Sequence, residues 1–496
     1  MAAIITEKFR MSNAQVFKDQ FALGTSSYYI FLGKSSPFSS LDAQNASDSS
    51  PPVPADDVTS EFYYHDDMLA AKKVGSTNVS FVIPRRNWVN QGTFDMYEHD
   101  ISTSNTTTSS ATNLFNSTFY FVTSEFRVYK VLDNNGGAAM SDGAEPSSES
   151  NTPFSSNGYV LQYMYTISAN DADKFLTNDF IPVLTNSTVA GAATDGSIIS
   201  LRVPNRGSGL TNGTYYAPVY GDGNNAGTAS GAIIRITVAG GQIATFGLTS
   251  GTDTTVHAAG AGYTYGNINL STLFSDNGLS SSSSIGTVGS ASVEVIISPK
   301  GGHGSDAPRE LGGHYVMLNT TFSNADTQDV TESNDFRRVG ILKNPYAFGT
   351  TTGTTFLTSL TARTTKALKL AASGLNENFV VDEKITQTNT GAIGKVVEYD
   401  ATNDILYYVQ ERFTDHGTNT NQNFIAFSGA NAVSGATGTG TPDAAADSTV
   451  DGIPFTDGYG NPEIQPDSGD IIYIENRSPI TRVSDQVEDI KIIVEF

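Results

Sequence analysis

The chain has 496 residues, of which only 16% are charged, and its 47 glycines, 22 tyrosines and 27 phenylalanines are typical of short strands joined by turns. This length excludes a single small domain. The formal net charge of -23 excludes the cationic surface that binds phosphate backbones, and no apolar run approaches the ~20 residues of a membrane-spanning helix. We therefore expect neither nucleic acid nor a membrane as a partner.

The chain contains no cysteine, which excludes a disulfide framework, a thiolate metal site and a cysteine nucleophile, and which fits a reducing compartment. Glu7, Lys8 and Arg10 interrupt the N-terminal region where a signal peptide needs apolar residues. We expect no cleaved secretory leader.

Two helices are predicted in the first 75 residues. The first is capped by Ser12, has apolar residues such as Val16 and Phe17 at helical spacing, and ends near Gly24. The second begins at Asp56 or Asp57 and runs to the cations Lys72 and Lys73, followed by Gly75, because cations favour a helix C-terminus.

From Asn78 onward the apolar period changes to two, with aromatic and β-branched residues in alternation, so most of the chain is predicted to form strands. Residues 134–137, Asn-Asn-Gly-Gly, predict a turn with positive φ, and residues 136–157 predict a loop. The segment 187–292 is predicted to form hairpins with glycine corners.

Further along, Phe356 to Ala372 has the apolar spacing of a helix, whereas residues 393–410 alternate on both sides of a turn at Asp400 to Asn403 and predict a hairpin. Residues 430–448 are rich in Gly, Ala, Thr and Asp and predict a loop. The final strand, IKIIVEF, is too short to stand alone and must pair with a sheet built elsewhere in the chain.

Two short motifs suggest chemistry without specifying it. Gly33-Lys34-Ser35 mimics the end of a phosphate-binding loop, but Tyr28 stands where that loop needs glycine, which favours a strand-to-turn corner. GGHGSDAP at 301–308 fits most of a calcium-binding repeat, yet it occurs once, which favours a tight loop.

The histidines have no metal-ligand spacing. His303 and His314 lie near Asp306 and Glu310 in the sequence, a group that in principle can chelate zinc or act as acid and base, but no spacing such as HExxH supports it and structural loop histidines are favoured. The other four histidines, His65, His99, His257 and His416, are scattered. Carboxylate pairs are too numerous to be diagnostic, and no G-x-S-x-G motif occurs. We therefore predict no catalytic residue, no metal and no cofactor.

Arg85, Arg86 and Trp88 are the most conspicuous polar and aromatic residues, because arginine forks pair with carboxylates and aromatic residues anchor interfaces. Two interpretations stay open: an internal pair that locks two domains, which Ile83 and Trp88 favour, or a contact with a neighbouring subunit. The same alternatives apply to three residues near the C-terminus, Glu475, Asn476 and Arg477, for which an internal network is favoured.

The runs FVIPRRNW at 81–88 and DSGDIIYIENRSPI at 467–480 are the most identifying parts of the chain. Further runs keep the same order: ITEKFRMSNAQVF, IFLGKSSPFSS, FRVYKVLD, GYVLQYMYTIS, NDFIPV, FRRVGILKNP and IKIIVEF. Together they resemble the dimeric wedge subunit of contractile phage-tail baseplates of T-even-like phages, enlarged by insertions. The resemblance covers about the first 185 residues, 293–345 and the last 30, whereas 187–292 and 346–465 have no counterpart that we place.

The resemblance and the strand pattern together predict a mainly β, multi-domain protein of antiparallel sandwich- or barrel-like domains with a few short helices and a discontinuous core. The expected domains are a core of 1–90 with 293–345 and 466–496, a second β domain of 91–186, and two insertions, 187–292 and 346–465, the latter with a small β-module.

The resemblance implies a non-enzymatic virion protein of the tail baseplate, made in the host bacterial cytoplasm. It implies a homodimer that bridges neighbouring wedge proteins. The alternative is a carbohydrate-binding adhesin or tail-fibre module, suggested by tyrosine-rich, glycine-rich runs such as GAGYTYG at 260–266.

Overall fold

The computed structural model describes residues 4–38, 46–323, 326, 329–353, 356–412, 418–419, 423–445, 447–483 and 486–496, so that His416 lies outside the described residues. The chain divides into two compact units, each built from segments that are far apart in the sequence. Unit 1 comprises Met1–Gln15, Ser80–Met317 and Ile493–Phe496, and unit 2 comprises Val16–Val79 and Leu318–Ile492.

The predicted fold class is confirmed. Strands make up 37% and helices 11% of the structure, and the described strand registers are antiparallel. The helices found in the described part of the chain are short: α1 (Glu7–Gln20), α2 (Val58–Asp66), α3 (Ala169–Phe175), α4 (Ser187–Ala192) and α5 (Ala307–Leu311).

The two N-terminal helices differ from their predicted bounds. Helix α1 begins at Glu7, where the hydroxyl of Thr6 accepts the backbone N–H of Phe9, so Ser12 lies inside the helix and was wrongly predicted as its cap. Helix α2 begins after Asp57 as predicted, because the carboxylate of Asp57 accepts the N–H groups of Thr59 and Ser60 at 3.0 Å.

Helix α2 ends at Asp66, and the predicted extension to Lys73 is wrong. Residues 68–73 form a strand in the middle of a sheet, where pairing on both edges outweighs helix propensity. This five-stranded sheet of unit 2 has the order β20-β2-β1-β19-β30. Its strands are β1 (Tyr28–Gly33), β2 (Met68–Lys73), β19 (Asn334–Lys343), β20 (Thr361–Arg363) and β30 (Asp470–Arg482).

Unit 2 also contains a nine-stranded sheet, with the order β26-β25-β22-β23-β24-β21-β29-β28-β27. The strands of this β-module are β21 (Lys366–Lys369), β22 (Lys384–Gln387), β23 (Ala392–Asp400), β24 (Ile405–Val409), β25 (Val433–Ser434), β26 (Thr439–Gly440), β27 (Ser448–Val450), β28 (Ile453–Thr456) and β29 (Tyr459–Gly460). The predicted hairpin is confirmed as β23 and β24.

Two local predictions in this region are wrong. Phe356 to Ala372 contains β20 and β21 instead of a helix, because Ala362, Ala367 and Leu368 are buried in two different sheets. The predicted loop at 430–448 contains the short strands β25 and β26 and the start of β27. In both places strand pairing with distant segments decides the conformation.

The last strand, β31 (Glu488–Glu495), pairs within a sheet of order β31-β18-β3-β8, as the sequence requires. The other strands of this sheet are β18 (Tyr315–Phe322), β3 (Val79–Pro84) and β8 (Phe180–Pro182). In unit 1 a four-stranded sheet has the order β4-β5-β7-β6, from β4 (Tyr120–Val122), β5 (Arg127–Asp133), β6 (Phe154–Ser156) and β7 (Tyr159–Thr166). The predicted turn after β5 is confirmed, with φ of 53° at Asn135 and 68° at Gly136.

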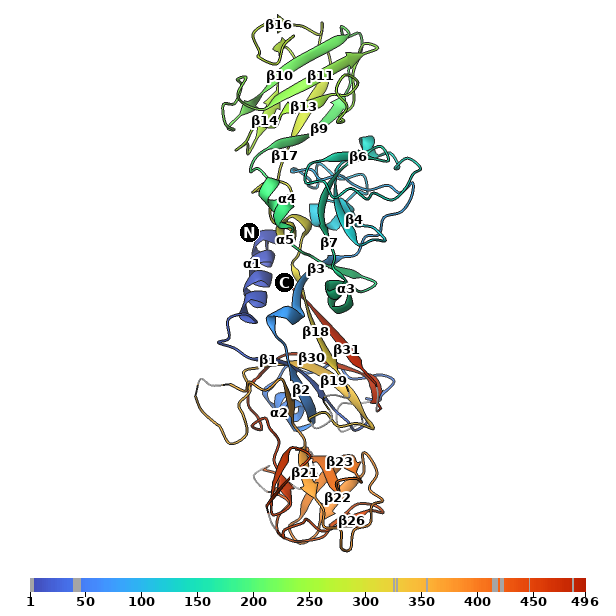
Figure 1. Cartoon of the computed structure of the whole chain (residues 1–496), viewed down its shortest axis with the longest axis vertical. Helices are drawn as coiled ribbons and strands as arrows, with labels where there is room; N and C mark the ends of the chain where they lie inside the picture. The colour runs from blue at the N-terminus through green and yellow to red at the C-terminus, as the bar shows by residue number, and fades with distance from the viewer. Residues whose placement is uncertain are drawn as a thin grey trace. The chain divides into compact units, whose positions relative to one another are not determined.

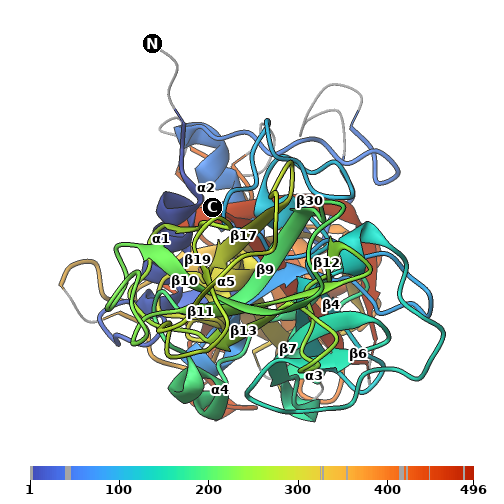
Figure 2. The same ribbon diagram turned by 90° about the horizontal axis from the view of Figure 1, so that it is seen from above.

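The glycine-rich segment after α4 is a folded β region of unit 1, in which β10, β11 and β13 lie next to one another (Figure 1 and Figure 2). Its strands are β9 (Ile198–Asn205), β10 (Gly213–Gly221), β11 (Ile233–Ala239), β12 (Gln242–Ile243), β13 (Thr255–Ala258), β14 (Gly266–Ile268), β15 (Leu273–Phe274), β16 (Ser282–Ser283) and β17 (Ser292–Ile297). Strand β9 pairs with β17, and the other strands form a seven-stranded sheet.

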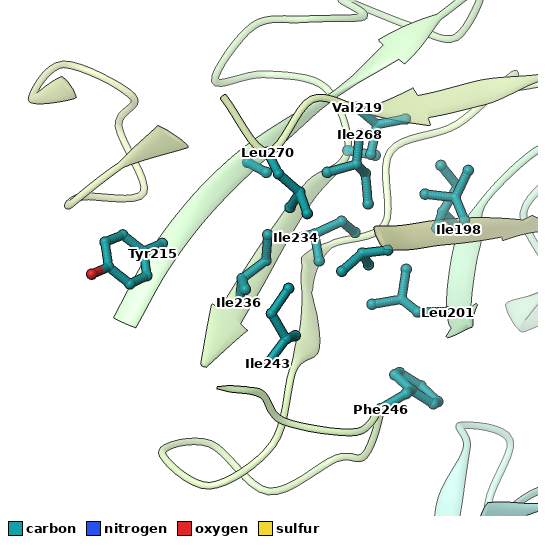
Figure 3. Close-up of a cluster of buried hydrophobic side chains, with 14 of the residues drawn as sticks. Ile198, Leu201, Tyr215, Val219, Ile234, Ile236, Ile243, Phe246, Ile268 and Leu270 are labelled. Atoms are coloured by element: carbon teal, nitrogen blue, oxygen red, sulfur yellow. The ribbon is translucent and has the colours of Figure 1, made fainter. Parts of the chain in front are cut away.

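A large buried cluster holds this region together. Ile198 and Leu201 of β9 lie near Ile234 and Ile236 of β11 and Ile268 of β14 (Figure 3). Each such side chain stabilises the fold by about 1.5–3 kcal/mol when it is fully buried. The inward residues of these strands therefore give a segment rich in glycine a buried core, to which Leu132 of β5 and Val160 of β7 also contribute.

Candidate functional site

Arg85 follows β3 directly and fastens this corner of unit 1 to the loop before β8. Its Nε donates to Oδ1 of Asn87 at 2.8 Å, and its Nη1 donates to the carbonyl of Thr177 at 3.0 Å. Its backbone N–H donates to the carbonyl of Asp179 at 2.7 Å, which extends the pairing of β3 with β8. The local role of Arg85 is thus to hold two loop ends together.

Arg86 lies against an aromatic ring. Its guanidinium carbon is 4.5 Å from the ring centroid of Tyr120, and its Nη2 donates to the carbonyl of Phe115 at 3.2 Å. Its Nη1 and the indole nitrogen of Trp88 are buried with no hydrogen-bond acceptor among the described residues. Trp88 packs half-buried against a core cluster of unit 1. Within the described structure Arg85 and Arg86 contact backbone carbonyls, the side-chain amide of Asn87 and the ring of Tyr120. A contact with a neighbouring subunit stays a prediction.

Asn476 is half-buried and joins a network of unit 2 in which Arg338 and Asp67 are buried. Its Oδ1 accepts Nε of Arg338 at 2.9 Å, and its Nδ2 donates to the carbonyl of Pro52 at 3.0 Å. Arg338 in turn donates from Nη1 to Oδ1 of Asp67 at 2.6 Å and lies 4.5 Å from the ring centroid of Tyr64. Burial raises the pKa of Asp67, and the charge of Arg338 opposes this rise. The network therefore joins β19, β30 and the end of α2.

Glu475 and Arg477 lie on β30 beside Asn476, but their side chains are 44% and 41% exposed and 3.8 Å apart. The hydroxyl of Tyr473 donates to Oε2 of Glu475 at 2.9 Å. A pair this exposed contributes between about 0 and 1 kcal/mol. The structure thus places Asn476 in a network with buried partners, whereas the Glu475–Arg477 pair lies at the surface.

The Gly33-Lys34-Ser35 run forms a corner in which Lys34 has φ of 60° and a side chain that is only 2% exposed. Nζ of Lys34 lies 3.7 Å from Oε1 of Glu411, and Nζ of Lys395 lies 3.0 Å from Oε2 of the same carboxylate. Two cations therefore face one buried carboxylate at the end of β1. This cluster of three charges links the five-stranded sheet to the β-module.

The loop at 301–308 is tight, as expected for its glycines. A Cβ at Gly302, which has φ of 94°, would lie 2.5 Å from the backbone nitrogen of Thr194. Asp306 caps α5, where its Oδ1 accepts the N–H of Arg309 at 3.2 Å. The carboxylate proposed as a calcium ligand therefore begins a helix.

His303 is buried beside a charged pair. Its ring contacts Tyr97 edge to face at 4.9 Å, and Nζ of Lys130 lies 2.8 Å from Oε2 of Glu310 nearby. Burial and the charge of Lys130 lower the pKa of His303, so its ring is neutral. His314 is elsewhere, 3.4 Å from Oε2 of Glu7. No group of three or more metal-ligating side chains is found in the part of the chain that the structure describes.

The family model described as "Bacteriophage T4, Gp8" matches residues 3–140 and 372–496, which is more than half of the chain. The chain belongs to the Gp8 family. It is therefore a wedge-type structural component of a phage tail baseplate and a virion protein that associates with other baseplate proteins. No curated protein matches the sequence.

The matched ranges differ from the expected coverage of this Gp8-family chain. Residues 141–371 are unmatched, although part of them carries runs that we assigned to the resemblance. Residues 372–465, which we assigned to an insertion without a counterpart, lie inside the match. The β-module from β22 onward therefore lies in a range shared with the family.

The run GAGYTYG, which suggested a sugar-binding surface, contains two tyrosines that differ in their exposure to solvent. Tyr263 is 1% exposed, and its hydroxyl accepts the backbone N–H of Ala232 at 3.0 Å. Tyr265 is 63% exposed. Of this pair, only Tyr265 presents a ring to solvent.

Proposed function

We propose that this baseplate protein is a homodimer that bridges neighbouring wedge proteins and works through its surfaces without catalysing a reaction. Membership of the Gp8 family supports a structural role. No helix in the described ranges combines the length and the apolar character needed to cross a membrane. Synthesis in the host bacterial cytoplasm is part of the same proposal.

The observation that carries the dimer is an exposed apolar stripe on and before helix α1. Phe9 and Val16 are each 57% exposed and lie seven residues apart in α1, so they share one side of the helix, and Ile5, just before the helix, is 70% exposed. Met11 and Ala14 on the other side are buried. A helix that is apolar on two sides is normally buried on both.

A second copy of the chain is the occupant that suits this stripe. Each copy carries a net charge of -23, so two copies repel each other, and an apolar contact supplies the attraction that opposite charges cannot. A two-fold axis places the same stripe on both sides of the interface, which makes the contact self-complementary.

Bridging also needs a second surface for the neighbouring wedge proteins. Ile472 on β30 is 44% exposed, and Val483 and Val487, between β30 and β31, are 50% and 59% exposed. Strand β30 is the end strand of its sheet and has a free edge in the described sheet order. We assign the free edge of β30 to the neighbours in the wedge.

Light scattering on the purified full-length chain at micromolar concentration tests the dimer. We expect a mass of twice 52.6 kDa for the wild type and a single-chain mass for Phe9→Glu/Val16→Glu. Lys8→Glu, a charge change of the same size on the same helix but outside the stripe, should remain dimeric. A wild-type monomer would overturn the dimer, and a dimeric double variant would overturn the role of the stripe.

A further inference from the structure

A cavity of about 240 Å³ lies in unit 2, where the end of α2, the β-module and the segment before β30 meet. It has room for roughly eight water molecules at ~30 Å³ each, which is small for a drug-sized ligand. Its polar lining includes His65, Asp66, Lys366, Gln410, Arg412 and Asp467, and its apolar lining includes Met68, Phe424 and Ile464.

Lys366 is the unusual group of this cavity. Its Nζ donates to Oε1 of Gln410 at 2.6 Å and lies 5.2 Å from the ring centroid of Phe424. The orientation of Gln410 is fixed, because its Nε2 donates at 3.0 Å to the carbonyls of Ile393 and of Ile425. Among the residues that the structure describes, the ammonium of Lys366 has no carboxylate partner within ion-pair distance.

The other cation of the cavity is already neutralised. Nε of Arg412 lies 3.2 Å from Oδ1 of Asp66, and Nη2 donates to both carboxylate oxygens of Asp467 at 2.6 Å. The guanidinium also lies 4.7 Å and 5.3 Å from the ring centroids of Phe62 and Phe424. Arg412 is therefore held by two acids and two rings, whereas Lys366 donates to the neutral amide of Gln410 and is attracted by Asp66 only from beyond ion-pair distance.

Burial shifts the pKa values of these groups. It lowers the pKa of Lys366 to about 8 and raises the pKa of Asp66 to about 8, while it also lowers the pKa of His65. A buried ammonium whose only described acceptor is a neutral amide is costly unless an anion balances it.

We propose that this cavity binds a small monocarboxylate, with its carboxylate against Lys366 and its apolar part against Met68, Phe424 and Ile464. One ammonium with hydrogens left after its bond to Gln410 matches a single negative charge. A doubly charged phosphate would be repelled more strongly than a monoanion by the carboxylates of Asp66 and Asp467 in the same cavity. The ligand is therefore a monoanion with a short apolar chain.

Line broadening of the methyl resonance of butyrate, added to the full-length protein at pH 7, tests this site. We expect the wild type to broaden the resonance with a dissociation constant in the millimolar range, and to bind acetate less tightly because acetate leaves the apolar lining unfilled. Lys366→Met keeps the aliphatic stem and should weaken butyrate binding at least tenfold, whereas Lys366→Arg should retain binding.

Lys384→Met, an exposed lysine of β22 in the same β-module, is the matched control and should bind butyrate as the wild type does. Phosphate at equal ionic strength should not displace butyrate. The proposal is overturned if the wild type does not broaden the resonance, if Lys366→Met broadens it equally, or if phosphate competes as well as acetate. The wild-type and phosphate measurements decide the matter even if a variant does not fold.

Discussion

Nζ of Lys130 on β5 and Oε2 of Glu310 on α5 lie 2.8 Å apart, and their side chains are 0% and 2% exposed. The ammonium also lies 4.1 Å from the ring centroid of Tyr97. These residues are 180 positions apart in the sequence, so the pair exists only in the folded unit 1. Its stability depends on both partners, because an unpaired charge at this depth has no access to water.

Removal of one partner should therefore be costly. We expect Lys130→Met to lower the free energy of unfolding of unit 1 by about 3–5 kcal/mol, because Glu310 is then buried without its cation. The double variant Lys130→Met/Glu310→Leu should recover most of this loss. A chemical-denaturation double-mutant cycle measures both, and a double variant as unstable as the sum of the singles would contradict the pairing.

The neighbouring residues Asn476 and Arg477 should respond very differently to substitution. Asn476→Ala removes the acceptor for Arg338 and the bond to Pro52, and should destabilise unit 2 by about 1–3 kcal/mol. Arg477→Ala, whose side chain is 41% exposed, should change stability by less than about 0.5 kcal/mol. Equal losses in urea denaturation would show that the exposed pair matters as much as the buried network.

Glu398 on β23 should make stability depend on pH. Burial raises its pKa from 4.5 to about 7, although the backbone N–H of Glu332 donates to its Oε2 at 2.7 Å. The folded chain thus keeps this proton where the unfolded chain releases it. The resulting stabilisation is complete below pH 4.5 and is lost as pH rises to about 7.

Glu398→Gln removes this titration. Between pH 5 and 7 we expect the wild type to lose stability relative to the variant by up to ~1.4 kcal/mol per pH unit, measured by denaturation at each pH. Glu61→Gln, which changes an exposed glutamate of α2, is the control. Parallel pH profiles for the wild type and Glu398→Gln would refute the prediction.

Gly223 leaves space for a buried ring. A Cβ there would lie 2.3 Å from ring atoms of Tyr263, so Gly223→Ala should destabilise unit 1 by about 1–3 kcal/mol. A Cβ at Gly191 in α4 would meet no heavy atom within 4 Å, so Gly191→Ala should be neutral or stabilising by up to ~1 kcal/mol. Thermal unfolding followed by circular dichroism compares the two, and a neutral Gly223→Ala would contradict the close packing of Tyr263.

Much of the local structure was predictable from short-range signals. The cap at Asp57, the positive φ at Asn135 and Gly136, and the hairpin on both sides of Asp400 depend on neighbouring residues alone. Among the candidate site residues, Asn476 was named from its run in the sequence, but its partners Arg338 and Asp67 were not predicted. The signal that could have found them was a charge at an inward position of an otherwise apolar strand, as for Lys130 and Arg338.

The sequence by itself determined the class of the protein: alternating aromatic and β-branched residues require sheets, the missing cysteine excludes disulfides, and the C-terminal runs indicate the family. Only the tertiary structure decided that residues 68–73 and 356–372 form strands, and that Lys130 faces Glu310. The physical reason is the distance in sequence between the residues that interact. Caps and turns are fixed by bonds between residues a few positions apart, whereas strand pairing and buried ion pairs depend on segments that meet only when the chain has folded.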